Sequence, residues 1–307
     1  MIEMLRTPDS RFYGLPEYPF NPNYLEINGG RIHYVDEGKG EVILCLHGEP
    51  TWSFLYRKMI APLKKNYRVI APDFFGFGRS DKFTRQKDYT FNMHYRTLIK
   101  FIEKTELKDI TLVVQDWGGL IGLSVLGEHP ELFKRVVIMN TSLPIGNRPM
   151  PLPFKLWKAF SRFWPKFPIE KVMKMGCHKE VKKDVLHSYR APFPTEKYLA
   201  GARVWPQLVP TGKDDPGVKQ MTRAREVLKT WTKPALVMFS DKDPITRGAE
   251  KWFLNNIPSI EHEPLITIYG AGHFLQEDKG KLIAEHIHEF ILRSNAREQE
   301  PPASAAG

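Results

Sequence analysis

The sequence predicts an α/β fold with a mostly parallel sheet, helices on both faces and an inserted helical cap. Short apolar runs rich in Val, Ile and Leu alternate with helical patterns along most of the chain, and this alternation is typical of a mostly parallel sheet. With 307 residues and 42% hydrophobic content, the chain can bury a large core and exceeds the usual length of one simple domain. We therefore expect a sheet-based core that carries an insertion.

Seven apolar runs are interpreted as the strands of the core. They lie at 32–35, 42–46, 68–71, 111–115, 136–140, 235–239 and 265–269. The strand at 42–46 precedes a loop and a helix that begins near Ser53, and helical patterns at 91–106 and 117–128 accompany the next strands. This alternation of strands and helices predicts a mostly parallel sheet.

Residues 143–229 interrupt the core pattern. They contain proline, tryptophan and amphipathic helical stretches but no convincing strand, so we interpret them as a helical cap and assign residues 1–142 and 230–294 to the core. Residues 295–307 are rich in Ala, Pro, Glu and Ser, which offer little apolar surface to bury and predict a disordered tail. A ligand site is expected between the strand ends of the core and the cap.

The segment from Leu112 to Gly119 carries the most informative chemistry. An apolar strand turns there into a glycine-bearing helix start, as in the nucleophile elbow of hydrolases, but Asp116 stands where serine is usual. A carboxylate with a reference pKa of about 3.9 is ionised at neutral pH and can displace a leaving group without a base. Activated water must then cleave the resulting ester. The alternative is that Asp116 serves only as the N-cap of the helix that follows it.

Downstream residues supply a base and an acid in the expected order. His273 follows the last strand on a glycine-rich loop and is the candidate base. Asp243 lies just past the strand at 235–239, and the order Asp116, Asp243, His273 matches the nucleophile, acid and histidine order of α/β-hydrolases. Asp241 is the alternative acid, although Asp243 directly precedes a turn-forming proline.

The loop after the strand at 42–46 is the candidate oxyanion hole. The six residues from His47 to Trp52 lead into a helix. Hydrolases of this kind take one oxyanion-hole amide from such a loop and the other from the residue after the nucleophile. We therefore assign the backbone N–H groups of Glu49 and Trp117 to this role. His47 is interpreted as a structural histidine that holds the loop.

Four motifs together resemble those of the haloalkane dehalogenases, a family of the α/β-hydrolase superfamily. They are HGEPTWS at 47–53, APDFFGFGRSD at 71–81, QDWGG at 115–119 and GAGHF at 270–274. Their common order and their spread along the chain make the resemblance specific, whereas a lone glycine pair indicates only a turn. The resemblance implies an α/β-hydrolase fold with an inserted helical cap.

The resemblance also implies two N–H donors for a departing halide. One is the tryptophan after the nucleophile, Trp117, and the other is an asparagine after the His-Gly pair or a tryptophan of the cap. Position 49 is glutamate, which cannot donate when ionised, so the subfamily with paired tryptophans is implied. The stretch 154–161 resembles the cap segment that carries the second donor, which assigns Trp157, with Trp164 as the alternative.

The implied activity is hydrolytic dehalogenation of haloalkanes to a primary alcohol, halide and a proton through a covalent alkyl-aspartate ester. Asp116 would attack the halogen-bearing carbon, and His273, oriented by Asp243, would activate the water that cleaves the ester. This chemistry needs no cofactor and no metal. The expected partners are a small apolar halogenated substrate, halide and water.

Particular residues would distinguish other enzymes of this fold from a haloalkane dehalogenase. An epoxide hydrolase would use the same triad and needs two cap tyrosines, for which Tyr189 and Tyr198 are the candidates. A dehalogenase of the fluoroacetate type would carry arginine after the nucleophile, where this chain has Trp117. The second alternative is a non-catalytic ligand receptor on this fold, and the complete triad argues against it.

Positive charge is concentrated in the expected cap. Residues 143–229 hold 18 Lys and Arg and 7 Asp and Glu, whereas the formal net charge of the whole chain is +10. No nucleic-acid-binding signature accompanies this charge, so we interpret it as a solvated surface and expect no nucleic-acid partner. The sequence shows neither a signal peptide nor a membrane span, and its two cysteines argue against a disulfide framework. We expect a cytoplasmic monomer or weak oligomer without membrane attachment.

Overall fold

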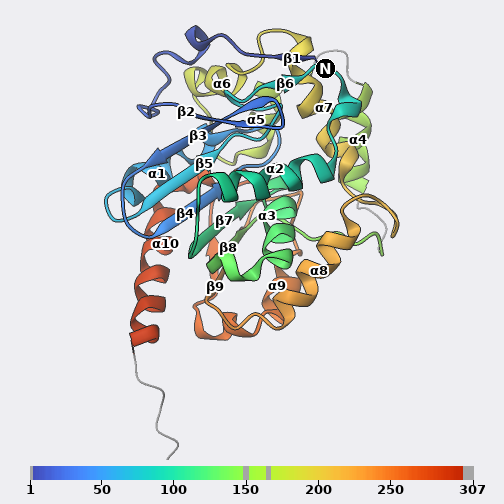
Figure 1. The fold of residues 1–307 in the computed structure, drawn as a ribbon. Helices are drawn as coiled ribbons and strands as arrows, with labels where there is room; N and C mark the ends of the chain where they lie inside the picture. The colour runs from blue at the N-terminus through green and yellow to red at the C-terminus, as the bar shows by residue number, and fades with distance from the viewer. Residues whose placement is uncertain (1–2, 148–151, 164–166, 300–307) are drawn as a thin grey trace, which may run out of the picture.

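The computed structural model describes residues 3–147, 152–163 and 167–299, and it confirms a mostly parallel sheet with helices on both faces (Figure 1). The main sheet has eight strands in the order β10-β9-β8-β7-β4-β5-β3-β2. β2 pairs with β3 and β3 with β5 in antiparallel orientation, and the other neighbours are parallel. Its strands are β2 (Asn23–Ile27), β3 (Gly30–Glu37), β4 (Val42–Leu46), β5 (Arg68–Pro72), β7 (Ile110–Gln115), β8 (Phe133–Met139), β9 (Ala235–Ser240) and β10 (Ile266–Ile268), and a separate pair is formed by β1 (Met4–Leu5) and β6 (Lys82–Phe83).

Helices cover both faces of the sheet. α1 and α10 pack together on one face, while α2, α3 and α8 lie on the other (Figure 1). The α-helices are α1 (Arg57–Leu63), α2 (Phe91–Lys104), α3 (Trp117–Glu128), α4 (Leu152–Phe163), α5 (Ile169–Gly176), α6 (Lys183–Arg190), α7 (Ala200–Leu208), α8 (Val218–Lys229), α9 (Glu250–Asn256) and α10 (Leu275–Gln299). Short 3₁₀ helices lie at η1 (Asp9–Phe12), η2 (Ser53–Tyr56), η3 (Gln86–Asp88), η4 (Pro130–Leu132), η5 (Glu196–Leu199) and η6 (Pro258–His262). Within the described residues, no helix has the length and apolar character needed to cross a bilayer.

The central strands β4, β7 and β8 are almost completely buried because helices cover both faces of the sheet. In the parallel register, Leu46 lies opposite Val114, and Gln115 lies opposite Met139. The carboxyl ends of the three strands therefore meet at one edge of the sheet. This edge, called the carboxyl edge below, is where ligands usually bind in such sheets.

The apolar runs miss one strand of the main sheet, β2. It pairs antiparallel with β3 at the edge of the sheet, and most of its residues are only half buried. The two strands are joined by Asn28 and Gly29, both with positive φ, as a tight hairpin turn requires. An edge strand covered on one side has no continuous apolar run, so the pattern used for the buried strands did not reveal it.

The described part of the expected cap, residues 143–229, contains helices and no strand. Its last helix, α8, packs along α3 of the core. A Cβ added at Gly127 of α3 would lie 2.6 Å from the Cα of Ala224, so the two helix backbones are in close contact. We therefore propose that the cap comprises α4 to α7 and that α8 belongs with the core.

The disordered tail predicted to begin at residue 295 starts too early in the prediction. α10 extends to Gln299, so residues 295–299 are helical and not disordered. Asn295 contacts Arg135, and Arg297 contacts Glu263. These polar contacts to the core hold the end of the helix, and composition alone does not reveal them. Residues 300–307 lie outside the described residues.

Candidate active site

Asp116 occupies the tight turn between β7 and α3. Its φ of 51° and ψ of −125° lie in a region that residues other than glycine rarely adopt. The turn requires glycine two residues later, because a Cβ at Gly118 would lie only 2.0 Å from the carbonyl oxygen of Leu46. The Asp116 side chain makes no capping hydrogen bond to α3. Its carboxylate is directed instead to the groups described next.

Three side chains meet at the carboxyl edge of the sheet. Nε2 of His273 lies 3.4 Å from Oδ2 of Asp116, and Nδ1 lies 3.1 Å from Oδ2 of Asp243. Asp243 also accepts the N–H of Ile245 at 2.8 Å, and it accepts both the N–H and the hydroxyl of Thr246. The histidine thus lies between two carboxylates, one of which is held by several donors.

Two polar residues near these side chains have structural partners. Asp241, the alternative acid, accepts the N–H of Gly270 at 2.8 Å and has no contact with His273 among the interactions of the described residues. His47 accepts the N–H of Phe74 at Nε2, 3.0 Å away, and its Nδ1 lies 3.0 Å from the carbonyl oxygen of Gly48. Both residues hold the loops that surround the site.

Neighbouring charges determine the protonation of His273. Burial alone would lower the pKa of its imidazole, but Asp243 and Asp116 raise that pKa to about 10. Conversely, burial would raise the pKa of Asp243, but His273 and the donors of Thr246 and Ile245 lower it to about 2. At neutral pH, the free site therefore holds an imidazolium beside the Asp243 carboxylate.

Glu49 contributes both its backbone and its side chain to the site. Its N–H donates to Oδ1 of Asp116 at 2.8 Å, and Trp117, the other candidate oxyanion-hole residue, begins α3 directly after Asp116. The Glu49 residue is 6% exposed, and its side-chain Oε1 has no hydrogen-bond partner among the described residues. Burial and the nearby Asp116 raise its pKa well above the ordinary value. Burial therefore favours the protonated acid, which can donate a hydrogen bond, over the carboxylate, which cannot.

A cavity of about 1080 Å³ lies between the carboxyl edge and the cap. Asp116, Glu49 and His273 line its core side, and residues of α4 and α5 line its cap side. Much of the wall is apolar, with contributions from Leu120, Leu143, Ile145, Phe154, Leu156, Val172, Met175 and Phe274. Such a cavity suits a small apolar molecule placed next to the Asp116 carboxylate.

Trp117 and Trp157 line this cavity from the core and from the cap, respectively. The Trp157 ring stacks on Phe160 with 5.5 Å between centroids and meets Phe167 edge-on at 5.7 Å. No hydrogen bond joins either indole N–H to another described residue. Both indoles thus line the cavity and keep an N–H group without a partner among the described residues. The alternative donor, Trp164, lies outside the described residues.

Trp205 of α7 is a third tryptophan near the site, and sequence reasoning missed it. Its ring lies 5.0 Å from that of Trp117, and its N–H donates to Nε2 of His94 at 2.6 Å. Burial lowers the pKa of His94 to about 3, so the neutral imidazole can accept this bond. Trp205 therefore supports the Trp117 ring. Its contact with His94 joins residues 111 positions apart, which no local motif reveals.

Asn140 and Gln115 brace the loop that carries His273, and sequence reasoning assigned them no role. The Asn140 side chain donates to the carbonyl oxygens of Gly272 and His273, each at 3.1 Å. The Gln115 side chain donates to the His273 carbonyl at 3.2 Å. Both are buried polar residues at the carboxyl ends of neighbouring parallel strands. That placement is the signal that could have identified them.

Tyr189 and Tyr198, the candidate tyrosines of an epoxide hydrolase, are not among the described residues that line the cavity. Tyr189 is fully buried, and its hydroxyl donates to Oε2 of Glu277 at 2.6 Å. Tyr198 packs against the hydrophobic core. Neither hydroxyl is therefore placed to protonate an epoxide oxygen at Asp116.

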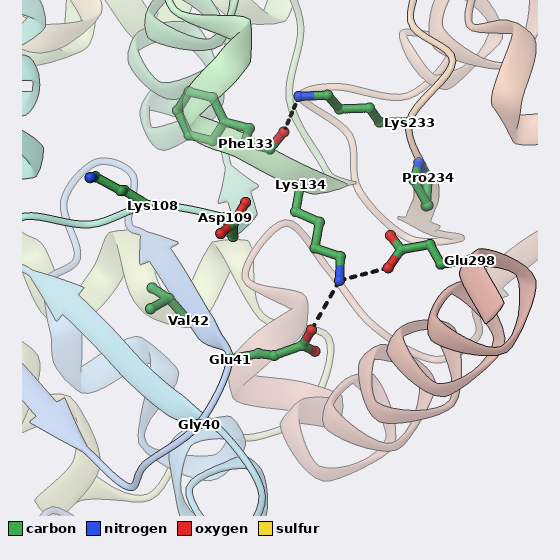
Figure 2. Close-up of a pocket in the computed structure, with 10 residues that line it drawn as sticks. All are labelled: Gly40, Glu41, Val42, Lys108, Asp109, Phe133, Lys134, Lys233, Pro234 and Glu298. Atoms are coloured by element: carbon green, nitrogen blue, oxygen red, sulfur yellow. Dashed lines mark hydrogen bonds and ion pairs between the residues drawn. The ribbon is translucent and has the colours of Figure 1, made fainter.

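A second cavity, of about 650 Å³, lies at the opposite end of the parallel strands, beside the first residues of β4, β8 and β9. Lys134 is the central cation there, and it pairs with Glu41 at 3.2 Å and Glu298 at 2.8 Å (Figure 2). Lys233 donates to the carbonyl oxygen of Phe133 at 2.8 Å. These ammonium groups already have partners within the protein, so we assign no ligand to this cavity.

Known proteins resemble this chain over nearly its whole length. Residues 41–280 match the family model of the alpha/beta hydrolase fold. The chain is 43% identical to a haloalkane dehalogenase of Psychrobacter cryohalolentis, over 94% of this chain and 98% of that protein. It is 46% identical to haloalkane dehalogenase 1 of Mycobacterium tuberculosis, over 93% of this chain and 98% of that protein.

A solved structure agrees with these sequence relatives. It is the tetrameric structure of haloalkane dehalogenase DpaA from Paraglaciecola agarilytica, which superposes on this chain with a TM-score of 0.87. The two sequences are 38% identical, and the alignment covers 92% of this chain and 97% of DpaA. Sequence and fold therefore point to the same group of enzymes.

Proposed function

Because the chain belongs to the haloalkane dehalogenases, hydrolases of the α/β-hydrolase fold that act on carbon–halide bonds, we propose that it forms a covalent alkyl ester on Asp116. The products are then a primary alcohol, halide and a proton, without a cofactor. The observation that best supports this mechanism is the position of the Asp116 carboxylate. It faces an apolar cavity and lies 3.4 Å from Nε2 of His273.

The first step is displacement of halide by Asp116. Oδ1 accepts the N–H of Glu49 at 2.8 Å, whereas Oδ2 has only the longer contact of 3.4 Å to Nε2 of His273, so Oδ2, the more weakly held oxygen, attacks the halogen-bearing carbon. The new C–O bond forms as the carbon–halogen bond breaks, and the halide takes the bonding electron pair. The indole N–H groups of Trp117 and Trp157 donate hydrogen bonds to the departing halide. Each such bond to an anion is worth about 1.5 to 3 kcal/mol.

The second step is hydrolysis of the ester. Esterification removes the charge of Asp116, which is one cause of the high His273 pKa, so this pKa falls, the imidazolium releases its proton to solvent, and the neutral imidazole is available as a base. His273 takes a proton from water as the water oxygen attacks the ester carbonyl of Asp116. The backbone N–H groups of Glu49 and Trp117 stabilise the oxyanion that forms. The imidazolium then protonates the leaving alkoxide, and Asp116 loses the remaining proton.

Further aspects of the protein are proposed on the same basis. We propose a cytoplasmic location because both cysteines, Cys45 and Cys177, are free and buried. We also propose a monomer or a weak oligomer, although the DpaA relative is described as tetrameric. Light scattering at several protein concentrations measures the mass of the particle, and a stable tetramer at micromolar concentration would contradict this proposal.

Halide release is the decisive test of the activity. Wild-type protein should release bromide and protons from 1,2-dibromoethane and 1-bromobutane in a weakly buffered assay with a pH indicator. The Asp116→Ala variant should release neither, and wild type should not hydrolyse styrene oxide. Formation of a diol without bromide release would instead support the epoxide hydrolase alternative. Loss of both activities would favour the receptor alternative.

A further inference from the structure

Asp278, in the first turn of α10, joins the catalytic loop to the cap. Its side chain is buried, and its two oxygens accept three backbone N–H groups. Oδ2 accepts the N–H of Gly272, the residue before His273, at 2.8 Å, and the N–H of His178, also at 2.8 Å. Oδ1 accepts the N–H of Lys179 at 2.9 Å. One carboxylate thus binds the histidine loop and the linker between α5 and α6 of the cap at the same time.

The two segments that Asp278 joins are also in direct contact. The N–H of Phe274 donates to the carbonyl oxygen of Gly176 at 3.2 Å. A Cβ at Gly272 would lie 2.3 Å from that same carbonyl oxygen, and a Cβ at Gly176 would lie 2.3 Å from the Phe274 ring. No space separates the cap from the histidine loop here, so a displacement of residues 176–179 must displace residues 272–274.

We propose that Asp278 is a positioning residue that couples the placement of the cap to the placement of His273. This inference rests on the proposed two-step function. His273 acts in hydrolysis of the ester, whereas Asp116 is held by its own turn and by the N–H of Glu49. Weakening the Asp278 contacts therefore slows the second step selectively, because a general base misplaced by about 1 Å can lose about 100-fold in rate.

Asp278→Asn is the direct test of this role. Asparagine has one acceptor oxygen, and its NH₂ group would face a backbone N–H, so at least one of the three hydrogen bonds is lost. Tyr189→Phe is the matched control, because Tyr189 also joins the cap to α10, through Glu277. Neither Tyr189 nor the Glu277 side chain makes a hydrogen bond to residues 270–274 among the described interactions. The two variants therefore separate loosening of the cap from displacement of His273.

Rapid-quench kinetics with 1-bromobutane resolve the two steps. The bromide burst reports alkylation of Asp116, and decay of the alkyl-enzyme, followed by intact-protein mass, reports hydrolysis. In Asp278→Asn, the hydrolysis rate constant should fall about 10- to 100-fold while the alkylation rate constant changes less than about threefold, so the alkyl-enzyme accumulates. In Tyr189→Phe, the ratio of the two rate constants should stay within about threefold of wild type.

An equal loss in both steps of Asp278→Asn, or the same ratio of rate constants in both variants, would overturn the coupling. If Asp278→Asn does not fold, Gly176→Ala disturbs the same contact from the cap side. It should also slow hydrolysis more than alkylation, and an unchanged ratio there would contradict the proposal. Failure of the proposed function itself looks different, because wild type would then give no bromide burst and His273→Phe would form no alkyl-enzyme.

Discussion

The core half and the cap half of the active-site cavity are built differently. In the core half, Asp116 and the N–H of Glu49 are placed by backbone turns directly after buried strands. In the cap half, Trp157 is placed by packing of its ring on Phe160 and Phe167. A turn attached to a buried sheet holds an atom more tightly than side-chain packing on a short helix does. We therefore expect the core half to determine whether reaction occurs, and the cap half to determine which molecules are held.

The largest expected effect is in the core half, at Asp116. Asp116→Ala removes the attacking oxygen, so turnover of 1-bromobutane should fall by about 10⁴-fold or more. Initial-rate measurements of bromide release test this. The matched control is Asp241→Asn, since Asp241 lies near the site but binds the N–H of Gly270, and its loss of rate should be far smaller. If Asp241→Asn is the more damaging substitution, the assignment of the carboxylates is wrong.

The next effect separates the two steps within the core half. His273→Phe removes the base but leaves Asp116 and the halide donors, so alkylation should proceed and hydrolysis should stall. Steady-state turnover should fall about 10³-fold or more. Intact-protein mass should rise by the alkyl group and stay raised. Normal turnover by this variant would show that another residue activates the water.

A smaller effect is expected in the cap half, at Trp157. Trp157→Phe removes one N–H donor to the halide, so the dissociation constant for bromide should rise about 10- to 100-fold, corresponding to about 1.5 to 3 kcal/mol. Quenching of tryptophan fluorescence by bromide gives this constant. Trp164→Phe is the control and should change it little. The opposite result would exchange the roles of the two tryptophans.

A substitution at Glu49 tests whether the second halide donor lies in the core half or in the cap half. Its protonated carboxyl could itself donate to an anion. If Trp157 is the second donor, Glu49→Met, which keeps the backbone N–H but removes the side-chain donor, should change the bromide dissociation constant by less than about threefold. Fluorescence quenching measures this change. A rise as large as that in Trp157→Phe would make the Glu49 side chain, rather than Trp157, the second halide donor.

The smallest effect is a pH dependence of stability. Because the folded-state pKa of His273 is raised from 6.5 to about 10, its contribution to the free energy of unfolding is complete below pH 6.5 and is lost as the pH rises to about 10. Asp116→Asn removes one raising charge, so it should lower the His273 pKa and move the loss of stability to lower pH. Urea unfolding between pH 6 and 10 measures this, and identical pH profiles would show that Asp116 does not influence His273.

The core half could largely be predicted from sequence, and the reason is geometric. β4 and β7 are buried parallel strands with continuous apolar runs, and the residue after such a run lies at the carboxyl edge. Short motifs therefore sufficed to predict that Asp116 and His273 lie together at this edge, where the structure places them 3.4 Å apart. The half-exposed edge strand β2 has no such run and was missed.

The supporting contacts could not be predicted in this way. Trp205 bonds a histidine 111 positions away, and Asp278 bonds the N–H of His178 across 100 positions. No local pattern encodes such pairs. The raised pKa of Glu49 is a second example, because it depends on burial and on Asp116, which is 67 positions away in the chain. Sequence patterns indicated which polar groups meet at the carboxyl edge but not the environment that tunes them.

The contact between α3 and α8 determines where this enzyme could exchange its cap with that of a relative. Gly127 and Ala224 bring these two helix backbones together, so a chimaera that replaced the chain as far as residue 229 would carry a foreign helix into the core. Gly217, with a φ of 93°, directly precedes α8. Crossover points after β8 and at Gly217 would leave this interface native, so that substrate preference could be transplanted as a module while the catalytic scaffold stays intact.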